Sequence, residues 1–237
     1  MSKLEVKNIV AGYSKDVDVL HDISLTVDDN CVALIGANGA GKSSTLKTIS
    51  KILPLKRGRI LFDGEDLGKL KPHQIVQKGI IQIPEEGGTF PNLTIYENLA
   101  VSCTGEESRK NLKKNMDVVY TFFPVLKERE KLMAGTLSGG QRKMLSIGKA
   151  IMAEPKLLLL DDISMGLAPK VVEDLYMMLG QLVSSLKIPV LIVEQIVDIA
   201  LDFAEYAHVL AQGRIILSGA SKDLLKSDEV QKIYIGG

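Results

Sequence analysis

Apolar residues near the start of the chain are spaced as in short β-strands. Segments 4–9 and 23–27 alternate apolar and polar residues, which is typical of antiparallel strands with one exposed face. Segment 31–35 (Cys-Val-Ala-Leu-Ile) is apolar throughout, which favours a strand covered on both faces. A helix is expected at 42–53, because the following Pro54 cannot continue it.

The middle of the chain has helical periodicity instead. Strand-like runs are missing between about 86 and 153. Thr94 and Glu97 have the spacing of a capping box, which predicts that a helix begins there. Two further helices are expected, at 106–127 and 141–153.

Strands and helices alternate again after this stretch, with apolar runs at 157–160 and 190–193. Such alternation produces a mainly parallel sheet. The sequence therefore predicts an α/β fold in one domain, with an N-terminal antiparallel β subdomain and an inserted helical subdomain. We expect the core to comprise about 1–85 and 154–237, and the helical subdomain about 86–153.

The composition narrows the classes of partner. The 237 residues are 46% hydrophobic and 24% charged, an ordinary balance for a globular protein. Basic and acidic residues number 29 each, so no net charge attracts nucleic acid and no nucleic-acid partner is expected. Cys31 and Cys103 are too few for a disulfide framework, and Cys31 is expected in the core.

Targeting signals are not visible in the sequence. No run reaches the roughly 18 apolar residues of a membrane-spanning helix, and the first residues lack the apolar core of a signal peptide. We therefore expect a cytoplasmic protein with no direct membrane insertion, which reaches the inner face of the cell membrane only through a partner.

Segment 36–43 (Gly-Ala-Asn-Gly-Ala-Gly-Lys-Ser) matches G-x-x-x-x-G-K-[ST] at each fixed position. An apolar strand precedes it and a predicted helix follows. The glycines let successive N–H groups converge on phosphate oxygens, and the helix N-terminus adds partial positive charge. Lys42 can reach the β- and γ-phosphates, and the Ser43 hydroxyl can ligate Mg²⁺. The segment predicts a site for a nucleoside triphosphate with Mg²⁺.

The apolar run 157–160 ends directly at Asp161 and Asp162. A buried strand followed by a solvated loop is the simplest interpretation of this pattern. Beside a phosphate-binding loop, a second interpretation is stronger, because the magnesium ion needs a carboxylate on a neighbouring strand. Asp161 is then the candidate that holds Mg²⁺ through water, and Asp162 the candidate that polarises the attacking water.

Segment 137–141 reads Leu-Ser-Gly-Gly-Gln, about twenty residues before Asp161. With the phosphate-binding loop, it resembles the L-S-G-G-Q signature of the ATP-binding subunits of ABC transporters, and the resemblance covers nearly the whole chain. Ser138 and the glycines begin a helix, which makes a second anion-binding end. The resemblance implies a P-loop NTPase core, ATP as the nucleotide, and a homo- or heterodimer. In that dimer the signature closes over the γ-phosphate bound to the other subunit.

The resemblance also assigns the individual site residues. Tyr13 matches the aromatic residue that stacks on adenine, Glu85 lies in the Q-loop, Gln195 lies in the switch region, and Glu85 is a further candidate for Mg²⁺. The implied catalytic residues are Asp162, Gln195 and Glu85, and the implied Mg²⁺ ligands are Ser43 and Asp161. The implied ATP-binding residues are Tyr13, Gly36, Ala37, Asn38, Gly39, Ala40, Gly41, Lys42, Ser43 and Ser44, and the signature residues for the partner's ATP are Leu137, Ser138, Gly139, Gly140 and Gln141.

Within the family, the chain most resembles the ATPases of branched-chain amino acid importers. Segments 84–94, 161–169 and 193–195 follow that subgroup's patterns P-E-G-R-R-x-F-P-x-L-T, D-E-P-S-x-G-L-A-P and V-E-Q, with departures. Gly87 and Gly88 replace its two arginines. The resemblance implies permease partners in a membrane and uptake of branched-chain or other hydrophobic amino acids.

Asp162 stands where the family has glutamate, and Ile163 stands where it has proline. Aspartate is shorter by one methylene, roughly 1.5 Å of reach, and a misplacement near 1 Å costs on the order of a hundredfold in rate. We expect slow but real ATP hydrolysis. Two alternatives stay open: an ATP-gated dimerisation module with very slow hydrolysis, and a soluble ABC ATPase without a permease.

Overall fold

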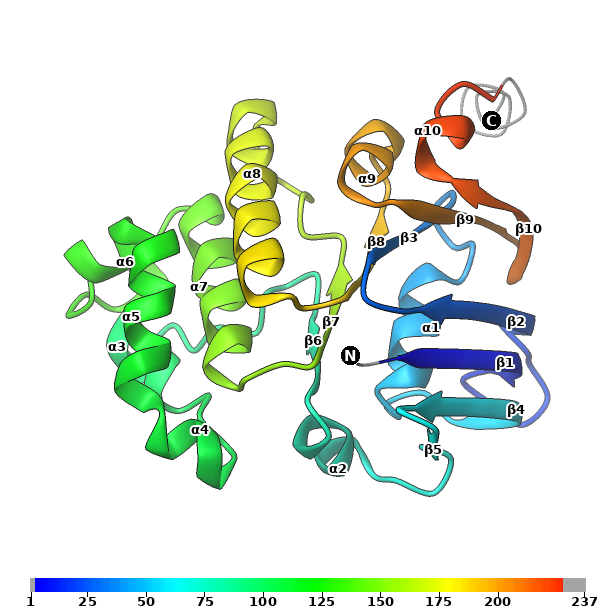
Figure 1. The fold of residues 1–237 in the computed structure, drawn as a ribbon, viewed down its shortest axis with the longest axis horizontal. Coiled ribbons are helices and arrows are strands. Elements are labelled where there is room, and N and C mark those ends of the chain that lie inside the picture. The colour runs from blue at the N-terminus through cyan, green and yellow to red at the C-terminus, as the bar shows by residue number, and fades with distance from the viewer. Residues whose placement is uncertain (1–2, 228–237) are drawn as a thin grey trace.

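The computed structural model describes residues 3–227 of the chain, which form a pair of β-sheets lying side by side, with helices around them (Figure 1). The first is a four-stranded antiparallel sheet. In spatial order it contains β2 (Leu20–Val27), β1 (Leu4–Ala11), β4 (Leu55–Phe62) and β5 (Glu65–Asp66).

The alternating patterns at 4–9 and 23–27 correctly predicted antiparallel strands, because β1 pairs with β2 from Leu4↔Val27 onward. The strand-like run that the sequence predicts at 59–62 is only the second half of β4, which begins at Leu55. Gly58, with φ of 88°, interrupts the strand pattern there, at a register shift against β1. A Cβ at Gly58 would lie 2.4 Å from the carbonyl oxygen of Asn8, so only glycine lets the two strands approach this closely.

The second sheet has six strands within the described residues. In spatial order these are β10 (Arg214–Ala220), β9 (Tyr206–Ala211), β3 (Cys31–Ile35), β8 (Val190–Glu194), β7 (Leu157–Asp161) and β6 (Ile80–Ile83).

Five of these six strands are parallel, and β10 runs antiparallel to β9. Ile35 at the end of β3 pairs with Glu194, and Asp161 at the end of β7 pairs with Val193. The carboxyl ends of β3, β7 and β8 therefore meet at one edge of the sheet. This topology brings together segments that are far apart in the sequence.

Both faces of the six-stranded sheet are covered, which explains its continuous apolar strands. One face packs against α1 (Lys42–Ile49) and the four-stranded sheet, and the other against helices that include α8 (Pro169–Leu186) and α9 (Val197–Phe203). The expected burial of Cys31 was wrong. It is half-buried, because it begins β3 near the surface, where its N–H donates to Glu205 Oε2 at 2.7 Å.

Between β6 and β7 the described elements are helical, and they gather on the side away from the four-stranded sheet (Figure 1). They are α3 (Ile95–Ala100), α4 (Glu106–Lys110), α5 (Leu112–Phe122), α6 (Pro124–Glu128), the 3₁₀ turn Ala134–Thr136 and α7 (Gly139–Met152). The remaining helices are α2 (Pro72–Gln77) and α10 (Ser221–Leu224). Among residues 3–227, no helix is long and apolar enough to cross a bilayer.

The predicted helix boundaries need three corrections. The helix at 42 ends at Ile49 rather than near 53, because Lys51 adopts φ of 63° and turns the chain before Pro54. The helix expected at 106–127 is three helices, with the last break before Pro124. The last of the three helices expected in this stretch, at 141–153, begins at Gly139 and ends at Met152. The capping box at Thr94 was correct: the Glu97 N–H donates to Thr94 Oγ1 at 3.1 Å.

Candidate active site

The predicted phosphate-binding loop, segment 36–43, runs from the end of β3 into the first turn of α1 and is shaped by its glycines. A Cβ at Gly36 would lie 2.3 Å from the carbonyl oxygen of Leu210, and Gly41 adopts φ of 108°, so neither position tolerates a side chain. Gly41 is also the N-cap of α1, and no side chain caps that helix. Its first N–H groups are therefore available to an anion.

Lys42 lies within this loop with 5% of its surface exposed. Its Nζ donates to the carbonyl oxygens of Gly36 at 2.8 Å and Ala37 at 3.3 Å. Burial lowers the pKa of Lys42, and the charges of Asp162 and Asp161 oppose that shift. The ammonium group is thus held at the centre of the loop by carbonyl oxygens, which a phosphate group can replace as a stronger partner.

Ser43 and Asp161 form the second contact of the site. The Ser43 Oγ donates to Asp161 Oδ1 at 2.8 Å across 118 positions of sequence. Burial raises the pKa of Asp161, the Ser43 hydrogen bond opposes this, and the nearby charge of Asp162 adds to it. A divalent cation next to this carboxylate would favour its ionised form.

The chemistry of these two donors fits Mg²⁺. A hydroxyl and a carboxylate are hard oxygen ligands, and Mg²⁺ is usually held by one or two protein ligands together with water and substrate phosphates. Within the described stretch of the chain, no group of three or more histidine, cysteine or acidic side chains is placed to hold a metal by itself. The site therefore suits an ion that arrives with a phosphate ligand.

Asp162 is buried beside Asp161 and adopts φ of 44°, a left-handed conformation that aspartate tolerates better than most residues. Its N–H donates to the carbonyl oxygen of Val193 at 2.9 Å, and its Oδ2 accepts a hydrogen bond from Gln195 Nε2 at 3.2 Å. The other oxygen, Oδ1, is buried without a hydrogen-bond partner among the described residues. A buried carboxylate oxygen in this condition is suited to accept a hydrogen bond from a bound water or ligand.

Many, but not all, of the residues predicted to bind ATP or to act in catalysis border one open cavity of about 480 Å³. From the phosphate-binding loop it is lined by Asn38, Gly39, Gly41 and residues 42–44. Tyr13, Glu85, Asp162 and Gln195 line it from elsewhere in the chain. Gly36, Ala37, Ala40 and Asp161 do not line the cavity; Asp161 lies behind Ser43.

Several neighbours of the candidate site were not predicted from the sequence. Val19 and Met165 also line the cavity. Lys143 on α7 donates to the Glu85 carbonyl oxygen and lies 3.5 Å from the Asp162 carbonyl oxygen. Of these residues, only Met165 lies in a segment that the sequence marks as part of the site, the importer-like segment 161–169. The positions of Val19 and Lys143 depend on the tertiary structure and could not be predicted from local sequence.

The loop that carries Glu85 is attached to α7 at a second point. Lys149 Nζ donates to the carbonyl oxygen of Gly88 at 2.6 Å and lies 4.1 Å from the centre of the Phe90 ring. Burial lowers the pKa of Lys149 to about 8. Gly87 permits this packing, since a Cβ there would lie 2.6 Å from Ser146 Oγ.

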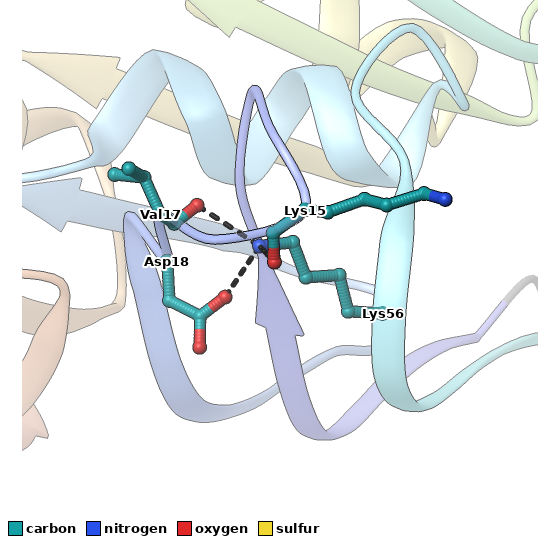
Figure 2. A network of polar contacts seen from close by, with 4 residues as sticks. All are labelled: Lys15, Val17, Asp18 and Lys56. Atoms are coloured by element: carbon teal, nitrogen blue, oxygen red, sulfur yellow. Dashed lines mark hydrogen bonds and ion pairs between the residues drawn. The ribbon is translucent and has the colours of Figure 1, made fainter.

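Tyr13 is 65% exposed, and its hydroxyl lies 3.2 Å from Ser44 Oγ. The loop that follows Tyr13 is fixed by one amine (Figure 2). Lys56 Nζ, from β4, donates to the carbonyl oxygens of Lys15 at 3.1 Å and Val17 at 2.9 Å and to Asp18 Oδ1 at 2.6 Å. The hydrogen bond from Lys56 lowers the pKa of Asp18.

The signature segment begins α7 outside this cavity. Ser138 is exposed and caps the helix, accepting from the Gln141 N–H at 3.3 Å, and Gly139 is half-buried. Leu137 and Gly140 are buried against the rest of the chain. None of the described residues that line the cavity belongs to 137–141. The structure thus does not bring the signature to the chain's own phosphate-binding loop.

Comparison with known proteins decides the family. The family model described as ABC transporter matches residues 20–164, more than half of the chain. The chain belongs to the ABC transporter family. The resemblance and the α/β fold inferred from the sequence are both confirmed, and the chain is an ABC ATPase subunit of a transporter.

Relatives of known name resemble this ABC subunit along its whole length. The high-affinity branched-chain amino acid transport ATP-binding protein BraG of Pseudomonas aeruginosa is 40% identical over 96% of this chain and 97% of its own. The lipopolysaccharide export system ATP-binding protein LptB of Haemophilus influenzae is 34% identical over 100% of this chain and 98% of its own. A nucleotide-free ATP-binding cassette from an ABC transporter has a TM-score of 0.85, with 28% identity and full coverage of both chains.

Lys56→Met tests whether the loop that follows Tyr13, which the Lys56 amine holds in Figure 2, contributes to ATP binding by this ABC subunit. The change removes the bonds that hold the loop after Tyr13, so we expect ATP affinity to fall about five- to tenfold, or about 1 kcal/mol. Calorimetric titration with ATP measures this. Lys7→Met is the control, because Lys7 pairs with Glu5 on its own strand β1, at 3.2 Å. Equal affinities in the two variants would show that Lys56 has no such role.

Proposed function

We propose that this chain binds and hydrolyses ATP as one of two ATPase subunits of an ABC importer. The paired subunits energise uptake of a small solute, branched-chain or other hydrophobic amino acids, through permease subunits in the membrane. The observation that carries the proposal is the meeting of Lys42, the Ser43–Asp161 pair and the unpartnered Asp162 oxygen at one sheet edge. The importer assignment is supported by the similarity to BraG and by the importer-like segment 84–94.

A second candidate is an export ATPase. It is favoured by the similarity to LptB, which extends over the full chain. The two candidates share the ATP chemistry and differ only in the permease. A permease-docking surface is expected around the loop that carries Glu85 and Phe90, where Gly87 and Gly88 replace the two arginines of the importer subgroup and so remove positive charge.

The binding step follows from the loop. The Lys42 ammonium group leaves the carbonyl oxygens of Gly36 and Ala37 for the phosphates of ATP, and the first N–H groups of α1 bind the same anion. Tyr13 stacks on the adenine. Mg²⁺, held by Ser43 and through water by Asp161, with Glu85 as a further candidate ligand, would neutralise phosphate charge.

The hydrolytic step is assigned to Asp162 and Gln195. Gln195 donates to Oδ2 of Asp162, which leaves Oδ1 to accept a proton from the attacking water. The water oxygen bonds to the γ-phosphorus while the bond to the bridging oxygen breaks, giving ADP and phosphate. The short reach of Asp162 makes this step slow.

Pairing of subunits completes the site. The exposed Ser138 and the start of α7 present N–H groups away from the chain's own cavity, so they can bind the γ-phosphate held by a second subunit. Helices α3–α7, within about 86–153, then act as the helical signature subdomain of a single ABC domain. A dimerisation module with very slow hydrolysis and an ABC ATPase without a permease are the alternatives to this function.

Variants of Asp162 test the proposed hydrolysis. We expect slow Mg²⁺-dependent phosphate release from the wild type, a loss on the order of a hundredfold or more in Asp162→Asn, which cannot accept the proton, and faster release in Asp162→Glu, which restores roughly 1.5 Å of reach. Asp117→Asn is the control, since Asp117 is exposed on α5. If Asp162→Asn releases phosphate as fast as the wild type, Asp162 has no catalytic role.

Pairing is tested by sedimentation velocity with Asp162→Asn, in which bound ATP persists. Adding ATP and Mg²⁺ is expected to double the sedimenting mass. A further Ser138→Arg change places a bulky side chain at the start of α7 and is expected to keep the protein monomeric, whereas Thr121→Arg, on the exposed face of α5, is not. A monomer in the Asp162→Asn protein with ATP would contradict pairing between copies of this chain.

A further inference from the structure

Glu194, the last residue of β8, is a buried carboxylate that the proposed mechanism does not use. It is 0% exposed and does not line the ATP cavity. Its Oε1 accepts from the Ser164 N–H at 3.0 Å and from the Tyr176 hydroxyl, and its Oε2 accepts from the Ser164 Oγ at 2.6 Å. Both oxygens therefore have partners, and both donors of Ser164 are directed at one carboxylate.

The neighbours of this network are residues of the active site. Ser164 lies between Asp162 and Met165, which both line the cavity. On the other strand, Glu194 is followed by Gln195, which donates to Asp162 Oδ2 at 3.2 Å. Two adjacent hydrogen-bonded connections thus join the chain after β7 to the end of β8. One is Gln195 to Asp162, at the cavity, and the other is Ser164 to Glu194, which is fully buried.

The third partner fixes the carboxylate from the helical side. Tyr176 lies on α8, is 8% exposed, and packs edge-to-face on Phe203 of α9 with ring centres 5.4 Å apart. Burial raises the pKa of Glu194, and the hydrogen bonds from Ser164 and Tyr176 oppose this shift. The orientation of the carboxylate is thus set by two packed helices and not by solvent.

Stability alone does not explain an acidic residue in this place. Well-packed apolar residues in place of buried charged networks often leave a protein equally or more stable. The network instead restrains segment 162–165, in which Asp162 is held in a left-handed conformation, with φ of 44°. Such a conformation persists only where surrounding contacts determine it.

We propose that Glu194 is a positioning residue for hydrolysis, which holds Ser164 so that Asp162 keeps its carboxylate at the place of the attacking water. This inference rests on the proposed function. The contacts proposed to hold the nucleotide, from Lys42 and the first turn of α1, share no hydrogen bond with the network, and Tyr176→Phe or Ser164→Ala leaves the charge of Glu194 in place. Loosening the network therefore changes turnover and leaves nucleotide affinity nearly unchanged.

Tyr176→Phe tests the proposal with a small change. It removes the tyrosine hydroxyl that donates a hydrogen bond to Glu194 and keeps the ring that packs on Phe203. Ser164→Ala is the second variant. It removes the hydroxyl that donates to Glu194 Oε2 and keeps the backbone N–H that donates to Glu194 Oε1. In both variants we expect kcat for ATP hydrolysis to fall about tenfold or more, because a displacement of the Asp162 carboxylate by a fraction of 1 Å is enough to slow the reaction by that factor. We expect KM for ATP, measured in excess Mg²⁺, to stay within about twofold of the wild-type value.

Tyr120→Phe is the matched control. Tyr120 is also 8% exposed and donates to a glutamate, Glu130 Oε2 at 3.1 Å, but it lies in the helical group away from the cavity. It is expected to leave kcat and KM unchanged. A second readout needs no activity: in nucleotide-free protein, exchange of the Ser164 amide hydrogen should be faster in Tyr176→Phe than in wild type or Tyr120→Phe.

The outcomes separate this inference from the proposed function. A wild type that hydrolyses no ATP overturns the proposed function, while the amide exchange still reports whether the network restrains Ser164. If the wild type hydrolyses ATP and both Tyr176→Phe and Ser164→Ala keep its kcat, the positioning role is overturned. A raised KM with unchanged kcat also overturns it, because the network would then act on binding.

Discussion

The burial of four charged side chains at one edge of a parallel sheet is the constraint on which the rest of the structure depends. Lys42 and the carboxylates of Asp161, Asp162 and Glu194 are buried there, and Lys143 of α7 lies beside them, 3.5 Å from the Asp162 carbonyl oxygen. Such a group persists only if its members are hydrogen-bonded or neutralised. Each of these side chains makes at least one hydrogen bond within the described residues, and the one fully buried side-chain oxygen among them that lacks a partner is Asp162 Oδ1. The Ser43–Asp161 pair offers hard oxygen ligands to a divalent cation, and the unpartnered oxygen of Asp162 is suited to a water.

The fold produces this arrangement through its topology. Parallel strands covered on both faces are rigid and dry, and their carboxyl ends fall on the same edge. The glycine-rich segment 36–43 follows β3. Asp161 ends β7 and Asp162 follows it, and Gln195 directly follows β8. The four-stranded sheet adds the Tyr13 loop, which Lys56 ties to β4, and α7 holds the Glu85 loop through Lys143 and Lys149.

Local patterns in the sequence predicted much of this architecture. Segment 36–43 defines its own loop and helix start, and the run 157–160 needs cover on both faces, so both could be interpreted without the structure. The start of β4 could not, because Gly58 is compatible with a strand only through its fit against Asn8. Contacts of Glu194 and Lys56 were also not predictable, since a charged residue in sequence does not reveal which distant carbonyl or hydroxyl will face it.

Binding of ATP with Mg²⁺ at this charged edge is the property on which every proposed role of the chain depends. Calorimetric titration of the wild-type chain with ATP, with Mg²⁺ present and then removed by EDTA, tests it most directly. Saturable binding of one nucleotide per chain that weakens when Mg²⁺ is removed is the predicted result. The absence of binding, or binding that is unaffected by Mg²⁺, would contradict a site for ATP with Mg²⁺ at this edge.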